Sequence, residues 1–161
     1  MHSRAQFLID TLGLTPHPEG GFFMRVYQSD RMVTPEDGRG SRRAFSVIYF
    51  LLVEGMFSRW HRVLSEEAWH HYEGAPLELF SVAGEGGSVT SHMLGPLNEG
   101  SAPLHVIPAG WWQAARTVGP YSLVGCSLGP GFEYDDFSLL SSVAVNLRPT
   151  FIPSVLLHAY L

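Results

Sequence analysis

The sequence predicts an all-β fold, an antiparallel sandwich or barrel, with a short N-terminal helix and a tail that is compatible with a C-terminal helix. The chain has 17 glycines and 11 prolines among 161 residues, so its elements are short and a helical bundle is disfavoured. Apolar runs of strand length recur between residues 44 and 128, and glycine or proline lies beside most of them. With 45% hydrophobic and 16% charged residues, the chain can bury a core and is unlike a disordered segment.

Local signals predict the elements in chain order. Residues 4–12 predict a short helix, because Ser3 can cap its start and Gly13 ends it. The segment HPEGGFF at 17–23 predicts a turn that leads into a strand, and the polar residues 30–43 predict a long loop. Further strands are expected near 44–53, 56–63, 67–73, 76–83, 87–94, 104–108, 111–117 and 121–128.

The expected organisation is a single domain over residues 1–161. Its parts are an N-terminal helical segment at 1–16, a barrel at 17–137 and a C-terminal tail at 138–161. In the tail, residues 139–147 are compatible with a helix and residues 155–161 with a last apolar turn.

Charge and composition argue against several classes of protein. A net charge of −5 argues against nucleic-acid binding, which needs a clustered positive face. The chain has no lysine, which excludes Schiff-base chemistry, and its single cysteine, Cys126, excludes an internal disulfide or a thiolate zinc cluster. The longest apolar run, 44–53, is about half a membrane span, and no signal peptide is recognisable. We therefore expect a cytoplasmic protein that binds neither nucleic acid nor membrane.

The residues that point to chemistry lie between Gly55 and Gly74. If two neighbouring strands run through this segment, a tight turn brings His61 and Glu67 together on one face. An imidazole opposite a carboxylate inside a barrel can form an acid–base pair or half of a metal site. His71 lies roughly 13 Å along the strand from Glu67, so the two cannot share a metal ion.

Part of this pattern resembles the metal-binding motifs of cupins. The first cupin motif is matched at Gly55, His61, Glu67 and Gly74. Val63 occupies the place of its second histidine. In the second motif Pro108 and Gly110 match, while Gln113 replaces the histidine. The resemblance therefore retains only two of the four usual metal ligands.

A closer resemblance covers most of the chain. It rests on HPEGGFF at 17–23, SRWHRV at 58–63, EEAWHHYEG at 66–74, PAGWWQAA at 108–115 and LGPGFEYDDF at 128–137. Together these segments resemble the small single-domain cupins grouped as cupin-5. The resemblance implies a double-stranded β-helix, which is a jelly-roll barrel similar to that of deoxysugar-nucleotide 3,5-epimerases, and usually a homodimer. It implies no particular reaction, because one fold supports many activities.

The candidate site consists of two catalytic residues and several ligand-binding residues. His61 and Glu67 are the expected catalytic pair. The expected ligand-binding residues are Arg59, Trp69, His71, Trp111 and Gln113. The PEGG turn at 18–21 is expected to fix the first strand and not to form the site.

Three functions are compatible with these residues. In the first, a metal-independent epimerase or isomerase acts on a small carbohydrate-like molecule: His61 removes a proton next to a carbonyl, Glu67 orients it, and Gln113 binds the oxyanion. In the second, the barrel binds a small metabolite without catalysis. In the third, His61, Glu67 and Gln113 weakly hold a divalent metal for lyase or oxygenase chemistry. We expect no cofactor, with the metal as the alternative.

Overall fold

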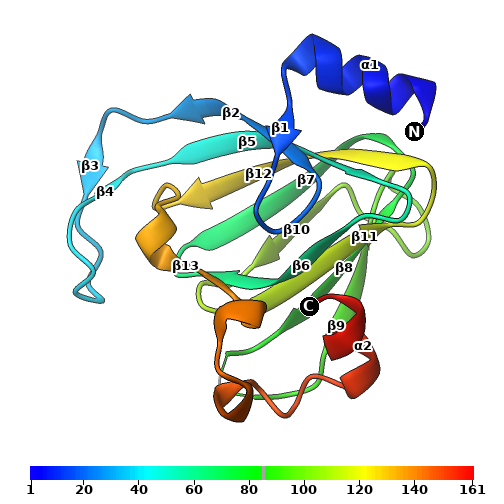
Figure 1. Cartoon of the computed structure of the whole chain (residues 1–161). Helices are drawn as coiled ribbons and strands as arrows, with labels where there is room; N and C mark the ends of the chain where they lie inside the picture. Colours follow the sequence, from blue (N-terminus) through cyan, green and yellow to red (C-terminus); the bar gives the residue numbers. More distant parts are fainter. Residues whose placement is uncertain (85) are drawn as a thin grey trace.

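The computed structural model describes residues 1–84 and 86–161, and it consists of two antiparallel sheets that face each other (Figure 1). Helix α1 (Ser3–Leu12) covers the outer face of one sheet, and helix α2 (Ser154–Ala159) lies against the outer face of the other. The predicted all-β fold with a short helix at each end is therefore confirmed. Within the described residues, neither helix has the length and apolar character needed to cross a membrane.

The larger sheet has six strands in the order β1-β2-β5-β12-β7-β10. These are β1 (Thr15–Pro16), β2 (Phe22–Gln28), β5 (Ser46–Val53), β12 (Tyr121–Gly129), β7 (Glu66–Gly74) and β10 (Leu104–Ile107). Ile48, Cys126 and Trp69 are register partners across β5, β12 and β7. Partners in adjacent strands point to the same face, so these three side chains all face the interior.

The smaller sheet has five strands in the order β13-β6-β11-β8-β9. These are β13 (Phe137–Leu139), β6 (Phe57–Val63), β11 (Trp112–Thr117), β8 (Leu77–Val82) and β9 (Thr90–Leu94). Gln113 in the central strand is the register partner of His61 on one side and of Ser81 on the other. His61 and Gln113 therefore face the same interior as Trp69 of the opposite sheet.

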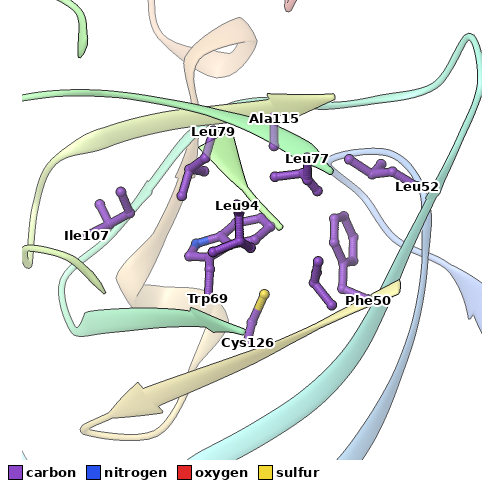
Figure 2. Close-up of a cluster of buried hydrophobic side chains, with 10 residues drawn as sticks. Phe50, Leu52, Trp69, Leu77, Leu79, Leu94, Ile107, Ala115 and Cys126 are labelled. Atoms are coloured by element: carbon purple, nitrogen blue, oxygen red, sulfur yellow. The ribbon is translucent and has the colours of Figure 1, made fainter. Parts of the chain in front are cut away.

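An apolar core fills one part of the space between the sheets. Figure 2 shows Trp69 at its centre, with the side chains of the other buried members around it. The core consists of Phe50, Leu52, Trp69, Leu77, Leu79, Leu94, Ile107, Ala115, Val124 and Cys126. Large side chains therefore fill this part of the barrel.

Two further apolar clusters attach the ends of the chain to the sheets. Ala5 and Leu8 of α1 pack against Leu51 and Leu123 on the outer face of the larger sheet. The C-terminal segment packs against the outer face of the smaller sheet, where the Trp60 indole donates a hydrogen bond of 3.1 Å to the carbonyl of Leu156. Both faces that these segments cover would otherwise expose large apolar side chains to water.

The local structure departs from the sequence predictions in the tail and in the long loop. Residues 139–147 form no α-helix but two 3₁₀ turns, η2 (Leu140–Ser142) and η3 (Val145–Leu147). The backbone is extended at Val143, between the two turns, and Arg148 donates hydrogen bonds to the carbonyl groups of Val143 and of Ser141 in η2. The strand expected at 87–94 begins only at Thr90.

The predicted long loop at 30–43 contains a small hairpin, formed by β3 (Met32–Val33) and β4 (Arg42–Arg43). Arg39 and Arg42 in this region form ion pairs with the buried carboxylate of Asp136, at 3.2 and 2.8 Å. Asp136 ends the 3₁₀ turn η1 (Tyr134–Asp136), so these ion pairs tie the loop to the segment that contains Tyr134.

Candidate functional site

A cavity of about 370 Å³ lies inside the barrel beside the apolar core. The buried part of its wall carries the polar side chains of Glu19, His61 and Glu67, together with the thiol of Cys126. Most of the remaining wall is apolar. The exposed lining residues, Gly13, Thr15, Arg25 and Tyr134, mark where the cavity opens to solvent. A largely apolar cavity with a few convergent polar groups is typical of a small-molecule site.

A β-bulge in β6 places His61 in the cavity wall. Gln113 is opposite His61 and Ala115 is opposite Ser58, so Arg59 and Trp60 together oppose one residue of β11. The extra residue brings both Ser58 and His61 to the inner face and turns Arg59 outward. His61 is 2% exposed, and its Nδ1 lies 2.7 Å from the backbone oxygen of Arg59. Because a carbonyl oxygen only accepts hydrogen bonds, Nδ1 carries a hydrogen and Nε2 is the basic nitrogen.

The carboxylate that contacts His61 is that of Glu19. Nε2 of His61 lies 3.3 Å from Oε2 of Glu19, while Oε1 accepts a hydrogen bond of 2.8 Å from the hydroxyl of Ser58. Burial lowers the pKa of His61 and raises the pKa of Glu19. Both shifts favour a neutral pair in which Glu19 holds the proton and His61 accepts it.

Glu67 lies in the same cavity but is held by other groups. Its Oε2 accepts a hydrogen bond of 2.6 Å from the amide of Gln113, whose own oxygen accepts one of 2.9 Å from the indole of Trp69. Burial raises the pKa of Glu67 to about 6, against a usual value of 4.5, and the nearby imidazole of His61 opposes that rise. Burial raises the pKa of the Cys126 thiol, so that thiol stays protonated.

The structure brings together the two predicted catalytic residues, because His61 and Glu67 both line the cavity. It corrects the expected role of Glu67, since Glu19 and not Glu67 makes the direct contact with His61. Gln113, the expected oxyanion donor, is fully buried and does not line the cavity; its amide donates a hydrogen bond to Glu67 and accepts one from Trp69. A residue that does not line the cavity cannot contact the oxyanion of a bound molecule.

The other predicted ligand-binding residues do not line the cavity. Trp69 belongs to the apolar core, and Trp111 packs against that core from its edge. Arg59 is exposed, because of the bulge, and donates to the backbone oxygen of Pro18. His71 contacts the backbone oxygen of Ala75, next to a second register shift that separates it from Glu73 in the pairing of β7 with β12.

The sequence patterns assigned no role in the site to Glu19 or His17. Glu19 was assigned to a structural turn, and Gly20 and Gly21 do adopt the positive φ angles that such a turn requires. Its carboxylate is nevertheless 6% exposed and lies in the cavity. His17 lies 3.6 Å from Glu19, and burial lowers its pKa. The available signal was a glutamate that lies two positions after a histidine and is followed by two glycines and an apolar strand.

The residues at the four cupin ligand positions do not fit a metal centre. Val63 has no donor atom, and Gln113, whose amide oxygen accepts a hydrogen bond from Trp69, does not line the cavity. Among residues 1–84 and 86–161, no three His, Cys, Asp or Glu side chains are arranged to hold a metal ion. The alternative set of His61, Glu67 and Gln113 therefore does not form a ligand sphere in this arrangement.

A smaller cavity of about 290 Å³ lies beside β9 and β10. The imidazoles of His92 and His105 stack there, with ring centroids 3.6 Å apart and an interplanar angle of 24°. Burial lowers the pKa of both histidines, which favours the neutral rings that such stacking needs.

Comparisons with known proteins agree with this architecture. A family model described as Cupin superfamily (DUF985) matches residues 6–140. A hypothetical protein from Leishmania major is 31% identical, with a TM-score of 0.78 over 83% of this chain and 85% of that chain. A protein from Shewanella oneidensis solved by X-ray crystallography is 35% identical, with a TM-score of 0.76 over 86% of this chain and 85% of that chain.

More distant similarity shows the fold alone. Oxalate decarboxylase from Bacillus subtilis is 16% identical, with a TM-score of 0.56, and the match covers 78% of this chain and 29% of that chain. Among curated proteins, none matches the sequence significantly.

Proposed function

Since this chain belongs to the cupin superfamily, we propose that it uses the interior of its barrel to bind a small polar organic molecule and to move a proton on that molecule. The observation that carries the proposal is the convergence of His61, Glu19 and Glu67 in one enclosed cavity. Groups that can exchange protons near neutral pH are costly to bury unless they are paired, and here they are paired beside space for a ligand.

His61 is the proposed base. The hydrogen bond from Nδ1 to the Arg59 carbonyl fixes the tautomer, so the lone pair of Nε2 is available on the cavity side. Nε2 faces the cavity and meets the protonated Glu19 carboxyl only at 3.3 Å, which is long for a hydrogen bond, so a bound molecule can take the place of that contact and give Nε2 a proton. The carbonyl oxygen of the Glu19 carboxyl then accepts a hydrogen bond from the imidazolium.

Glu67 is the proposed acid. In its protonated form it donates a hydrogen bond to the oxygen of a carbonyl group, while Gln113 keeps the carboxyl in place through Oε2. Removal of a proton from the neighbouring carbon breaks a C–H bond, and the electron pair moves onto that oxygen as an enolate. Return of a proton to the opposite face of the same carbon completes an epimerisation. If that carbon carries a hydroxyl group, Glu67 protonates the enolate oxygen, the hydroxyl loses its proton to become the new carbonyl, and the proton on His61 returns to the former carbonyl carbon, which completes an isomerisation. A pKa of about 6 lets Glu67 be protonated in part of the molecules near neutral pH.

Binding without catalysis is the second candidate function. The mostly apolar wall, with Phe23, Phe132 and Phe137, favours it, because such a wall binds an organic molecule without any chemistry. The two functions differ in whether His61 is needed for turnover.

Solvent exchange tests the proposal without knowledge of the substrate. The protein is incubated in D₂O with a panel of small aldoses, ketoses and 2-oxo acids, and loss of the C–H signal next to each carbonyl is followed by proton NMR. We expect exchange of at least one compound, and a loss of about 100-fold or more in His61→Asn, the usual scale for removing a general base.

His70→Asn is the matched control, because His70 faces away from the cavity, opposite Gly125 on the outer side of β7. It should exchange at the wild-type rate. If His61→Asn also exchanges at that rate, proton transfer by His61 is wrong. If compounds bind but none exchanges with the wild-type protein, the cavity is a binding module.

We also propose that the protein is a homodimer that pairs through the outer face of the larger sheet. Tyr72, Leu104 and Val106 expose large apolar surface on that face, at 50%, 49% and 45%. An exposed apolar patch of this kind marks an interaction site. We place this dimer in the cytoplasm, where the free thiol of Cys126 stays reduced.

A further inference from the structure

Arg25 lies at the mouth of the cavity, on the inner face of the larger sheet. It is the register partner of Ile48, which in turn is opposite Cys126. These three residues therefore point to the same side, and all three line the cavity. Because Arg25 is also exposed, its guanidinium lies between solvent and the enclosed part of the cavity.

Arg25 is the arginine of the cavity wall, and it forms no salt bridge with any residue that the structure describes. Its one side-chain hydrogen bond goes to the amide oxygen of Gln28, at 3.3 Å. Several other arginines are ion-paired, namely Arg4, Arg39, Arg42, Arg43 and Arg116. A guanidinium with only a long contact to a neutral amide keeps most of its donors for another group.

We propose that the molecule bound in the cavity carries a carboxylate, and that Arg25 binds this carboxylate at the mouth. This inference rests on the proposed function, because it names the class of ligand for the same cavity. A guanidinium presents two parallel N–H groups that match the two oxygens of a carboxylate. Arg25 is thus a specificity-determining residue that selects organic acids over neutral molecules of the same shape.

The side chains that line the cavity indicate the size and polarity of the rest of the ligand. Phe23, Phe132 and Phe137 line the cavity between the mouth and the buried polar groups. Flat apolar surfaces of this kind favour a short carbon skeleton or a ring. The volume of about 370 Å³ is at the small end of the range for ligand pockets, roughly 300–1,000 Å³, so the expected ligand is a small acid.

The distance between Arg25 and the buried polar groups is compatible with one small ligand that contacts both. Arg25 on β2 and Cys126 on β12 are separated by one intervening strand, so their backbones lie about 10 Å apart. Cys126 is next to Glu67, whose carboxyl it contacts. A carboxylate held at Arg25 therefore places atoms a few bonds away within reach of Glu67 and His61.

The buried carboxyl groups do not exclude an anionic ligand. Burial raises the pKa of both Glu19 and Glu67, so near pH 6 each carries less negative charge than a free carboxyl group would. The groups that face Glu67 are His61 on β6, Gln113 on β11, Cys126 on β12 and Glu19. None of these adds a fixed negative charge at the mouth, where Arg25 meets the ligand.

Isothermal titration calorimetry with benzoate and benzamide tests the proposal. The two probes have nearly the same shape, and only benzoate is charged. We expect the wild-type protein to bind benzoate at least tenfold more tightly than benzamide. Arg25→Gln should weaken benzoate binding at least tenfold and leave benzamide binding unchanged, because a hydrogen-bonded charge pair is lost only for the acid. Phenyl phosphate is the third probe, and it should bind more weakly than benzoate.

Arg31→Gln is the matched control, because it removes the same charge from an exposed position outside the cavity. It should leave all three affinities unchanged. Equal benzoate affinity in Arg25→Gln and wild type overturns the proposal, as does benzamide that binds as tightly as benzoate, or phenyl phosphate that binds more tightly. Those outcomes leave proton transfer by His61 intact. If none of the probes binds the wild-type protein at millimolar concentration, both the inference and the binding half of the proposed function are wrong.

Discussion

Glu67 combines a buried position with a single strong hydrogen bond, and this combination makes it sensitive to pH. Its folded-state pKa of about 6 lies above the usual value of 4.5, because burial disfavours the charged form. Between these two values, the folded state holds a proton that the unfolded state has lost. The free energy of unfolding therefore falls as the pH rises from 4.5 to 6, by about 2 kcal/mol, and it levels off above that range.

Glu67→Gln should remove this dependence while it keeps the hydrogen bond from Gln113. Relative to wild type, the variant is expected to gain about 2 kcal/mol of stability between pH 4.5 and pH 7.5. Urea unfolding of both proteins at the two pH values measures this difference. Glu66→Gln, at the exposed neighbouring position, controls for the general loss of one negative charge. A difference between Glu67→Gln and wild type that stays constant with pH would contradict the raised pKa.

At the residue scale, the sequence could predict His61 and Glu67, because their motif spacing and alternation put both on an inner face. It could not predict which carboxylate meets which nitrogen. The pairing of His61 with Glu19 joins positions that are 42 apart in the chain, and that of Gln113 with Glu67 joins positions 46 apart. Such contacts depend on how the sheets face each other and leave no local pattern.

The PEGG turn at 18–21 is the element that delivers Glu19 to the cavity. The backbone oxygen of Glu19 accepts a hydrogen bond of 2.8 Å from the amide of Arg59, so the turn is attached directly to the bulge that positions His61. Gly20 has a φ of +115°, and a Cβ at this position would overlap the backbone oxygen of Phe57. Glycine is therefore required both by the conformation and by the close approach of β6.

Gly20→Ala should lower the free energy of unfolding by at least about 2 kcal/mol, because it adds a steric overlap to an unfavourable φ. Gly38→Ala is the matched comparison: its φ is +80° but no atom lies within 4 Å of the added Cβ. Gly38→Ala should lower the free energy of unfolding by only about 1 kcal/mol. Thermal or urea unfolding of the two variants measures both losses of stability. If the two variants lose the same stability, the contact with β6 does not constrain the turn.

At the element scale, most strands agree with the sequence prediction, because glycine and proline punctuate them. The exceptions trace to features that alternation does not encode. The extra residue of the bulge in β6 turns the side chain of Arg59 outward and that of Ser58 inward. Strict alternation instead predicts that Arg59 and His61 share the inner face. Bulges arise from the pairing of whole strands, so a single strand read alone gives the wrong face.

At the scale of the whole molecule, the two sheets differ in how their outer faces are covered. The C-terminal segment lies over the smaller sheet, and α1 lies over only part of the larger one. Leu104 and Val106 of β10 remain exposed beside Ala68 and His70 of β7. This uncovered face is the surface through which we propose that two copies pair.

Val106→Glu should separate the proposed dimer, because a charge at the centre of an apolar interface loses its hydration when two copies meet. Wild type is expected to have a native mass of twice 17.8 kDa, and the variant a mass near 17.8 kDa with an unchanged circular dichroism spectrum. Analytical ultracentrifugation gives both masses. A wild-type protein that sediments as a monomer would remove the proposal.

The sequence was sufficient for the architecture because the fold depends on many distributed signals. Turn residues and short apolar runs indicate an antiparallel sandwich or barrel, and the resemblance to cupins narrows this class to a jelly roll. The loss of any one turn or apolar run would leave the predicted class intact. The site depends instead on a few long-range contacts. This is why the barrel could be predicted as a whole, while the position of Glu19 in the cavity emerged only from the arrangement of the strands.

The protonation state of His61 tests the central claim most directly. Long-range ¹H–¹⁵N NMR, with His61→Asn used to assign the signal, reports which ring nitrogen carries hydrogen and at what pH the ring becomes charged. We predict a neutral ring at pH 7 with hydrogen on Nδ1 and a bare Nε2, and a pKa below the usual 6.5. A ring that is charged at pH 7, or one with hydrogen on Nε2 instead of Nδ1, would contradict the proposed base.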